Sequence, residues 1–359
     1  MPCERVIETV WMPPERALIQ HRKGVVMRGI LVSTFLLVVM SGLAALPAQG
    51  TAPGKNGQIA FQHAGKSLWL INPDGTGERQ LTDFKGAEDE NPDWSPNGST
   101  IAFDRCSSHC EIWTVKADGT ASKRLGPNCL HKAGDCIDRA VPAWAPNGKA
   151  IASGAGWGPV KSDNHAFNEI IVLNPRGGGV RQLTHITTSK PFSVDVNRPM
   201  WSPDGKQIAF EVQKLSSTGE SLNQRALFIV NSDGSGLLQL TPWDLDAGDR
   251  PDWSPDGTLI LFRVISAAHK LHGNLYTIRP DGSGLKQLTN YSAPKAVLSG
   301  SFSPDGNWIT FSRFSGTSAY PAIFVMRADG SNVQQVTRTN RSTHRQPIDF
   351  QPDWGPRLR

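Results

Sequence analysis

The chain has 359 residues, of which 38% are hydrophobic and 19% charged, a composition typical of a folded protein and not of a disordered one. Its formal net charge of +5 falls to +3 without residues 1–50, which hold five basic and three acidic residues, so the charge does not indicate a nucleic-acid-binding protein. The 35 glycines and 26 prolines favour many turns over long helices and indicate an all-β protein.

An export signal precedes the folded part of the chain. Basic residues at 21–23 and 28 come before an apolar run at 30–46, and the small residues Ala48 and Gly50 follow with the spacing of a cleavage site. The sequence thus predicts an upstream extension at 1–26, a signal peptide at 27–50 that begins at Met27, and an exported domain at 51–359. An uncleaved membrane anchor is the alternative, because the apolar run approaches the length that spans a bilayer.

Four cysteines follow the signal, an even number in a chain sent to an oxidising compartment. They are Cys106, Cys110, Cys129 and Cys136. Three pairings are possible, and proximity in the sequence favours Cys106 with Cys110 and Cys129 with Cys136. A zinc site is the competing interpretation, but the spacings lack the paired Cys-x-x-Cys pattern.

A ten-residue pattern, WSPDGKQIAF from Trp201, recurs along the chain. Its aromatic anchors are Trp94, Trp144, Trp201, Trp253, Phe302 and Trp354, separated by 50, 57, 52, 49 and 52 residues. After each of the first five anchors comes an apolar strand such as IAF, then a second strand such as LFIV, a turn such as NSDG, and an outgoing QLT-like strand. Six anchors predict six units of four short strands.

The Ser-Pro-Asp-Gly segment supplies the turn inside each unit. Proline presets φ near −65° and glycine accepts a positive φ where the next strand begins, so the segment predicts a hairpin. The aromatic residue before the turn is expected on the innermost strand, where it packs between neighbouring sheets. A four-stranded sheet cannot cover both of its faces alone, so units of this size stack radially into a β-propeller.

The two ends of the repeated region complement each other. Residues 54–61 match the second strand of a unit but lack the aromatic strand before it, whereas residues 348–356 are that aromatic strand with no further unit after it. The sequence therefore predicts a six-bladed β-propeller closed by one blade that both ends share.

The repeated WSPDGxxIAF and LWxxxxDGxxxxxLT patterns resemble the TolB-type propeller repeat from about Gly54 to Pro356. The resemblance implies a six-bladed propeller that serves as a binding platform outside the cytoplasm. TolB proteins carry an N-terminal α/β domain before the propeller, and residues 51–53 leave no room for one. A role in binding the peptidoglycan-associated lipoprotein is therefore not carried over.

One face of the propeller is expected to hold the variable connections, including those that enter the aromatic strands nearest the central channel. These connections supply a ring of polar candidates for ligand binding: Asp89, Glu90, Asp138, Arg139, Asn197, Arg198, Asp249, Arg250, His344 and Arg345. Such a ring suits an anionic or hydroxylated ligand or a partner peptide. The alternative is that these acids and arginines pair with each other to support the loops.

Signs of catalysis are few, and no catalytic residue, metal or cofactor is predicted. No Gly-x-Ser-x-Gly motif occurs. His165, His269 and His272 could hold a metal, and the run from Asp244 through Asp246 to Asp249 could hold a cation, but both patterns are weak. We expect a monomeric, non-enzymatic platform for an envelope or secreted protein or a glycan, with membrane contact only through an uncleaved signal. A uronate lyase is the alternative function.

Overall fold

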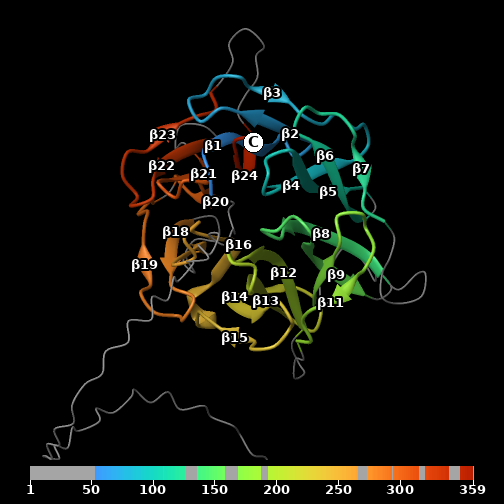
Figure 1. Ribbon diagram of the computed structural model, residues 1–359. Coiled ribbons are helices and arrows are strands. Elements are labelled where there is room, and N and C mark those ends of the chain that lie inside the picture. Colours follow the sequence, from blue (N-terminus) through green and yellow to red (C-terminus); the bar gives the residue numbers. More distant parts are fainter. Residues whose placement is uncertain are drawn as a thin grey trace, which may run out of the picture. The chain divides into compact units, whose positions relative to one another are not determined.

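The computed structural model describes residues 53–107, 109–126, 136–157, 169–186, 193–265, 273–292, 294–314, 320–338 and 348–358, and of residues 136–139 and 157 it describes the backbone alone. These residues form six four-stranded antiparallel sheets arranged around a channel, so the all-β class and the six-bladed propeller are confirmed (Figure 1). Apart from one 3₁₀ turn, η1 (Trp243–Leu245), every regular element described is a strand.

The blades follow one another in chain order, and blade 1 contains both ends of the described chain. Blade 1 consists of β24 (Asp349–Pro356), β1 (Asn56–His63), β2 (Ser67–Ile71) and β3 (Arg79–Gln80), and blade 2 of β4 (Glu88–Trp94), β5 (Thr100–Cys106), β6 (Cys110–Lys116) and β7 (Lys123–Arg124). Blade 3 consists of β8 (Cys136–Trp144), β9 (Ile151–Trp157), β10 (Glu169–Leu173) and β11 (Arg181–Gln182).

The second half of the ring repeats this plan. Blade 4 consists of β12 (Ser193–Trp201), β13 (Gln207–Leu215), β14 (Ser221–Asn231) and β15 (Leu238–Gln239). Blade 5 consists of β16 (Ala247–Trp253), β17 (Ile260–Ile265), β18 (Gly273–Ile278) and β19 (Lys286–Gln287). Blade 6 consists of β20 (Val297–Phe302), β21 (Trp308–Phe314), β22 (Pro321–Arg327) and β23 (Gln334–Gln335). Each aromatic anchor lies on the innermost strand of its sheet, as the sequence predicts; five of them end that strand, and Trp354 lies two residues before the end of β24.

The first strands of the six sheets form the inner wall of the propeller. Around the channel β4 contacts β8, β8 contacts β12, β12 contacts β16, β16 contacts β20, β20 contacts β24, and β24 contacts β4 (Figure 1). The ring is therefore closed, and β16 lies opposite β4, three strands away in either direction.

Blade 1 closes the ring in the way the two chain ends predict. Strand β24 pairs antiparallel with β1, and this pairing sets Trp354 opposite Ile59 and Asp353 opposite Ala60. The Trp354 indole donates a hydrogen bond to the carbonyl oxygen of Gly57 at 3.2 Å. The aromatic strand from the C-terminal end thus completes a sheet whose other three strands come from the N-terminal end.

The Ser-Pro-Asp-Gly turns take the predicted hairpin geometry. In blade 4 the Gly205 N–H donates to the Ser202 carbonyl at 2.9 Å, and Gly205 has a φ of 68°. The Ser202 hydroxyl donates to the Asp204 carboxylate at 2.7 Å, a further hydrogen bond within the turn. Equivalent contacts join Ser254 to Asp256 and Ser303 to Asp305, so the repeated motif has a structural role.

The strand pairing defines two faces of the ring. The bottom face carries the Ser-Pro-Asp-Gly turns and the turns that follow the third strands. The top face carries the hairpins that join second to third strands, because Cys106 at the end of β5 pairs with Cys110 at the start of β6. The start of each inner strand lies at the same end, since Glu88 pairs with Cys106. The strand ends that the variable connections join therefore lie at the top face, as expected. In the part of the chain described, no helix has the length and apolar character needed to cross a membrane.

Candidate functional site

The inner strands carry an unusual backbone feature just above their aromatic anchors. Five residues that precede a proline there have a positive φ although none is glycine: Asn91 (49°), Val141 (53°), Arg198 (56°), Arg250 (57°) and Gln351 (49°). Strand pairing is interrupted at the same level, for example between Glu90 and Asp93. Such a bulge turns side chains out of the regular strand alternation. In the sequence, this bulge corresponds to a proline placed two residues before the aromatic anchor.

Arg250 uses this bulge to reach across the channel. Its Nη2 atom donates to the carbonyl oxygen of Pro92 at 2.5 Å and lies 3.4 Å from Oδ1 of Asp93, both on the opposite inner strand β4. Arg250 is only 5% exposed. Its guanidinium therefore bridges the channel, between a top mouth on the side of the loops and a lower chamber on the side of the aromatic anchors.

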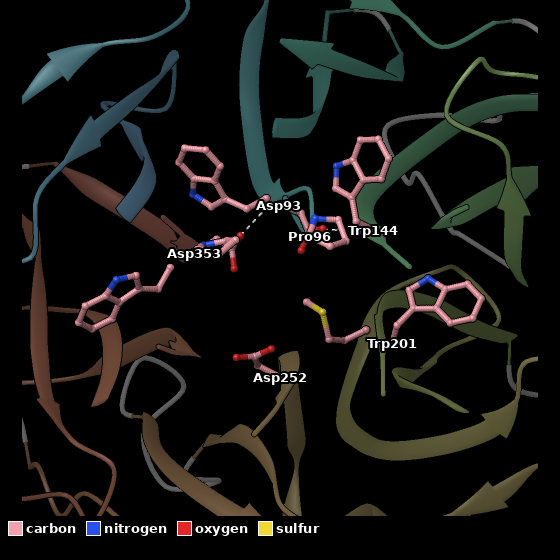
Figure 2. A pocket seen from close by; sticks show the side chains of 10 residues that line it. Asp93, Pro96, Trp144, Trp201, Asp252 and Asp353 are labelled. Atoms are coloured by element: carbon pink, nitrogen blue, oxygen red, sulfur yellow. Dashed lines mark hydrogen bonds between the residues drawn. The ribbon is translucent and has the colours of Figure 1, made fainter. Parts of the chain in front are cut away.

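Three aspartates surround the lower chamber, which has a volume of about 20 Å³, room for roughly one water molecule. Figure 2 shows the carboxylates of Asp93, Asp252 and Asp353 approaching it from three of the six blades. Each carboxylate accepts a hydrogen bond from the backbone N–H of the next blade's aromatic anchor. The pairs are Asp93 with Trp144 (2.6 Å), Asp252 with Phe302 (2.6 Å) and Asp353 with Trp94 (2.8 Å). These carboxylates latch neighbouring blades together.

Burial raises the pKa values of two carboxyl groups around this chamber, and repulsion between them adds to the shift of Asp93. Burial raises the pKa of Asp93 well above its usual range, and the nearby Asp353 raises it further, while Arg250 opposes the shift. Burial also raises the pKa of Asp353, again opposed by Arg250. The positive charge of Arg250 therefore compensates the carboxylates beneath it.

Blade 2 contributes an acidic side to the top mouth. Burial raises the pKa of Glu90 to about 7, with Asp104 and Glu88 adding repulsion. Burial raises the pKa of Asp104 to about 6, although the Asn91 amide donates to it at 3.2 Å. Carboxyl groups that titrate near neutral pH inside a cleft are candidates for a functional role.

Blades 4 and 5 contribute a network of alternating charges. Glu211, 1% exposed, lies 3.2 Å from Nη1 of Arg198 and 3.5 Å from Nε of Arg225, and accepts a hydrogen bond from the Asp249 N–H. Glu211 raises the pKa of Arg198. Asp249 in turn lies 3.0 Å from Nη1 of Arg263. Arg198 keeps 31% of its side chain exposed, so it is the member of this network that a ligand at the mouth reaches most easily.

Two of the three aspartates considered for a cation site, Asp246 and Asp249, already have arginine partners. Asp246 lies 3.3 Å from Nη1 of Arg225, and Asp249 contacts Arg198 and Arg263. His165, His269 and His272, the other metal candidates, lie outside the described residues.

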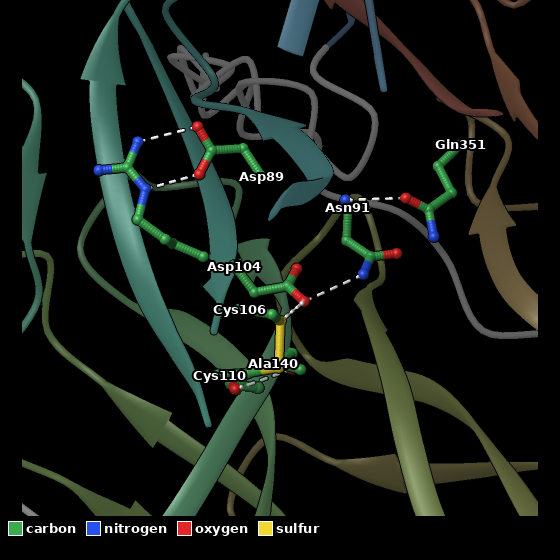
Figure 3. Close-up of a disulfide and its surroundings, with 9 residues drawn as sticks. Asp89, Asn91, Asp104, Cys106, Cys110, Ala140 and Gln351 are labelled. Atoms are coloured by element: carbon green, nitrogen blue, oxygen red, sulfur yellow. Dashed lines mark hydrogen bonds and ion pairs between the residues drawn. A yellow bond between two sulfur atoms is a disulfide. The ribbon is translucent and has the colours of Figure 1, made fainter. Parts of the chain in front are cut away.

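Asp89, another residue predicted for the channel mouth, pairs with Arg105 instead of with the channel residues. Both carboxylate oxygens of Asp89 accept hydrogen bonds from the Arg105 guanidinium, at 2.6 and 2.8 Å (Figure 3). Beside them the predicted disulfide between Cys106 and Cys110 is present and closes the top hairpin of blade 2 (Figure 3). The side chain of Cys136 is not described, and Cys129 lies outside the described residues.

The other predicted residues divide into three groups. Arg198 and Asp249 come together at the mouth, and Asn197, 5% exposed, accepts a hydrogen bond from the Arg198 N–H at 2.8 Å. Asp138 and Arg139 lie on inner strand β8, where only the backbone is described. His344 and Arg345 lie outside the described residues.

Several residues of the channel escaped the sequence analysis. They are Asp93, Asp104, Glu211, Asp252, Gln351 and Asp353. Asp93, Asp252 and Asp353 share one sequence signal, since each directly precedes the tryptophan anchor of its inner strand. Gln351 lies at the positive-φ position, and its side chain accepts a hydrogen bond from the Asn91 N–H at 3.0 Å (Figure 3).

Known proteins with similar structure and sequence include TolB proteins. The structure of TolB from Acinetobacter baumannii superposes with a TM-score of 0.59 over 84% of this chain and 67% of that one, at 17% identity. In sequence, 85 residues are 38% identical to the Tol-Pal system protein TolB of Zymomonas mobilis, over 23% of this chain and 16% of that protein. The chain is a TolB-like six-bladed β-propeller. No family model matches it.

Enzymes also appear among the similar proteins. An uncharacterized peptidase, YuxL, of Bacillus subtilis is 28% identical over 205 residues, covering 48% of this chain and 29% of the peptidase. An oligogalacturonate lyase in complex with manganese has a TM-score of 0.50 at 14% identity, over 81% of this chain and 87% of that one. The TolB-like chain thus spans less than a third of the two curated relatives named here, and the structural likenesses establish the fold alone.

Proposed function

We propose that this TolB-like propeller is an exported, non-enzymatic platform that binds a protein of the cell envelope through its top face. Export follows from the signal predicted at residues 27–50, and the periplasm or the cell exterior is the proposed location. The protein class of the partner is supported by the similarity to a Tol-Pal system protein, TolB.

The observation that carries the proposal is the bridge that Arg250 forms across the channel. The buried Arg250 guanidinium bonds to the opposite inner strand, so it bridges the channel below the loops of the top face. Arg198 and Glu90 lie on inner strands near the top face, and binding residues are commonly found on variable loops held by a rigid scaffold. The bottom face consists instead of tight turns whose polar side chains bond within the turns themselves.

A photo-crosslinking amino acid placed on each face tests the proposal in living cells. Glu88 is exposed at the top entrance of β4, and Lys206 is exposed in a bottom turn. We expect a discrete crosslinked protein from position 88 and none from position 206. Crosslinks from position 206 alone, or none from several exposed top-face positions, would disprove the proposal.

An enzyme is the second candidate. Glu90, whose pKa is raised to about 7, suits proton transfer at neutral pH, and Arg198 offers a partner for a uronate carboxylate. The resemblance in fold to an oligogalacturonate lyase makes acidic oligosaccharides the substrates to test. Chelator-sensitive formation of an unsaturated product, lost in Glu90→Gln, would favour the enzyme over the platform.

A further inference from the structure

A groove on the top face lies away from the channel, between blades 1 and 2. It has a volume of about 950 Å³, near the upper end of the range common for small-ligand sites. Its lining includes Lys66 and Ser67 at the β1–β2 hairpin, Phe84 and Lys85 in the connection to β4, and Ser107 beside the disulfide. None of the residues predicted for the channel mouth lines it.

Phe84 stands out in this groove because a large aromatic side chain is exposed there. Half of its surface, 50%, is accessible to solvent. The Arg105 guanidinium lies 4.3 Å from the centre of the Phe84 ring and 4.5 Å from that of Trp113, so Arg105 packs against both rings. Phe84 thus packs against Arg105 and keeps half of its surface available to a ligand.

The support beneath Phe84 is itself rigid. Arg105 is 8% exposed and is held by both oxygens of Asp89, which is fully buried. The next residue, Cys106, is fixed by its disulfide to Cys110. Because these residues are held in place, a binding surface built on them needs little reorganisation when a ligand binds.

The polar groups around Phe84 specify the chemistry of the ligand. Lys66 and Lys85 are balanced by Asp83 and Glu88 on the same lining, so the groove carries no strong net charge. Gln80 and the serine hydroxyls supply further hydrogen-bond donors and acceptors. A flat aromatic ring surrounded by mixed donors and acceptors matches a sugar, which has an apolar C–H face and a rim of hydroxyl groups.

We propose that this groove is a second binding site, separate from the channel mouth, for an uncharged oligosaccharide whose ring stacks on Phe84. The inference does not rest on the proposed binding of a protein partner. An acidic glycan or an acidic peptide would instead depend on Lys66 and Lys85, and its affinity would fall with salt.

The probes are three uncharged tetrasaccharides: β-1,4-linked N-acetylglucosamine, β-1,4-linked glucose and α-1,4-linked glucose. Saturation-transfer NMR with the purified protein detects contact, and titration measures affinity. We expect at least one probe to bind, with an affinity that changes less than about twofold in roughly 0.5 M NaCl. Absence of binding to all three probes, or a strong loss with salt, would overturn the proposal.

Variants separate stacking from a structural role of Phe84. Phe84→Ala should weaken binding at least about tenfold, whereas Phe84→Trp should keep it because the aromatic surface remains. Lys85→Ala, at an exposed position, should change binding of the uncharged probe by less than about twofold, whereas a large loss would indicate an acidic ligand. Tyr320→Ala, at a tyrosine that is 45% exposed on blade 6, is the matched control and should bind as the wild type does. Equal affinity of wild type and Phe84→Ala would contradict the inference, and thermal melting verifies that each variant is folded.

Discussion

The Asp353 carboxylate accepts a hydrogen bond from the Trp94 N–H at 2.8 Å, joining two residues 259 positions apart. Asp353 lies on the last strand of the chain and Trp94 on the inner strand of the following blade in the ring. This bond belongs to the set of carboxylate latches around the lower chamber, and it crosses from the closing blade to the next. Closure of the ring therefore depends on a buried polar contact as well as on strand pairing.

Removing the Asp353 carboxylate should weaken the ring. In Asp353→Ala the buried Trp94 N–H loses its acceptor, which costs about 1–3 kcal/mol of unfolding free energy. Asp353→Asn keeps an oxygen acceptor and should lose less. Urea unfolding measures both, with the exposed turn variant Asp118→Ala as the control. Equal stability of Asp353→Ala and wild type would refute the latch.

Deleting the C-terminal strand tests the shared blade itself. Without residues 348–359, strand β1 loses its partner β24 and Trp354 no longer packs in blade 1. We expect the cooperative melting transition to disappear. Removal of Leu358 and Arg359 alone is the control, because these residues lie outside β24. An unchanged transition after the longer deletion would show that the ring closes in another way.

The two channel arginines should behave differently when replaced. Arg250 is buried against Asp93, so Arg250→Ala leaves carboxylates without compensation and should cost about 3–5 kcal/mol of unfolding free energy. Arg198 is partly exposed, and Arg198→Ala should cost less while reducing ligand capture at the mouth. Chemical unfolding and binding measured on the same preparations compare the two. A larger loss of stability from Arg198→Ala than from Arg250→Ala would contradict this assignment.

Glu90 should make the protein less stable as the pH rises. Its pKa is raised to about 7 in the folded protein, so between its ordinary value near 4.5 and about 7 the folded state holds the proton more tightly than the unfolded state does. The unfolding free energy therefore decreases across this interval. Glu90→Gln should flatten the profile and stabilise the protein at pH 8 by about 1–2 kcal/mol, with no gain at pH 4.

The control for this pH profile is a carboxylate shifted in the other direction. Hydrogen bonds from Thr120 lower the pKa of Asp118 in an exposed bottom turn. Stability from this group is present above the ordinary pKa and is lost as the pH falls through the lowered value. Asp118→Asn should therefore affect the acid end of the profile only. A Glu90→Gln profile parallel to that of the wild type would show that Glu90 titrates normally.

The disulfide of blade 2 should contribute a modest amount of stability. Cys106 and Cys110 enclose a short loop, and closing such a loop in the unfolded chain accounts for about 2 kcal/mol. The double variant Cys106→Ser, Cys110→Ser should lose that amount, and reducing agent should then have less effect on it than on the wild type. Mass spectrometry of non-reduced peptides should recover the Cys106–Cys110 link, and free thiols at both positions would contradict it.

The sequence predicted features that repeat or that lie close together in the chain. The hairpin around Gly205, the aromatic anchors and the Cys106–Cys110 pair each depend on local geometry or on a pattern present several times. The shared blade was predictable because the strand missing at one end appears at the other. These features follow from the spacing and chemistry of residues near one another in the sequence.

The channel contacts were not predictable because they depend on the dimensions of the closed ring. Arg250 bonds to Pro92, 158 positions away, only because β16 and β4 face each other across a narrow channel. Asp353 reaches Trp94 only after the last blade closes. The titration of Glu90 depends on burial beside Asp104, which no local pattern encodes.

Affinity capture from an envelope extract tests the central claim most directly. The purified wild-type protein is compared with a top-face variant, Arg139→Ala with Arg198→Ala, and with a bottom-face variant, Arg279→Ala with Arg327→Ala, whose positions lie next to exposed turns. If the top face is the binding platform, the wild type and the bottom-face variant retain the same protein and the top-face variant loses it. Loss from the bottom-face variant, or equal retention by all three, would contradict the claim.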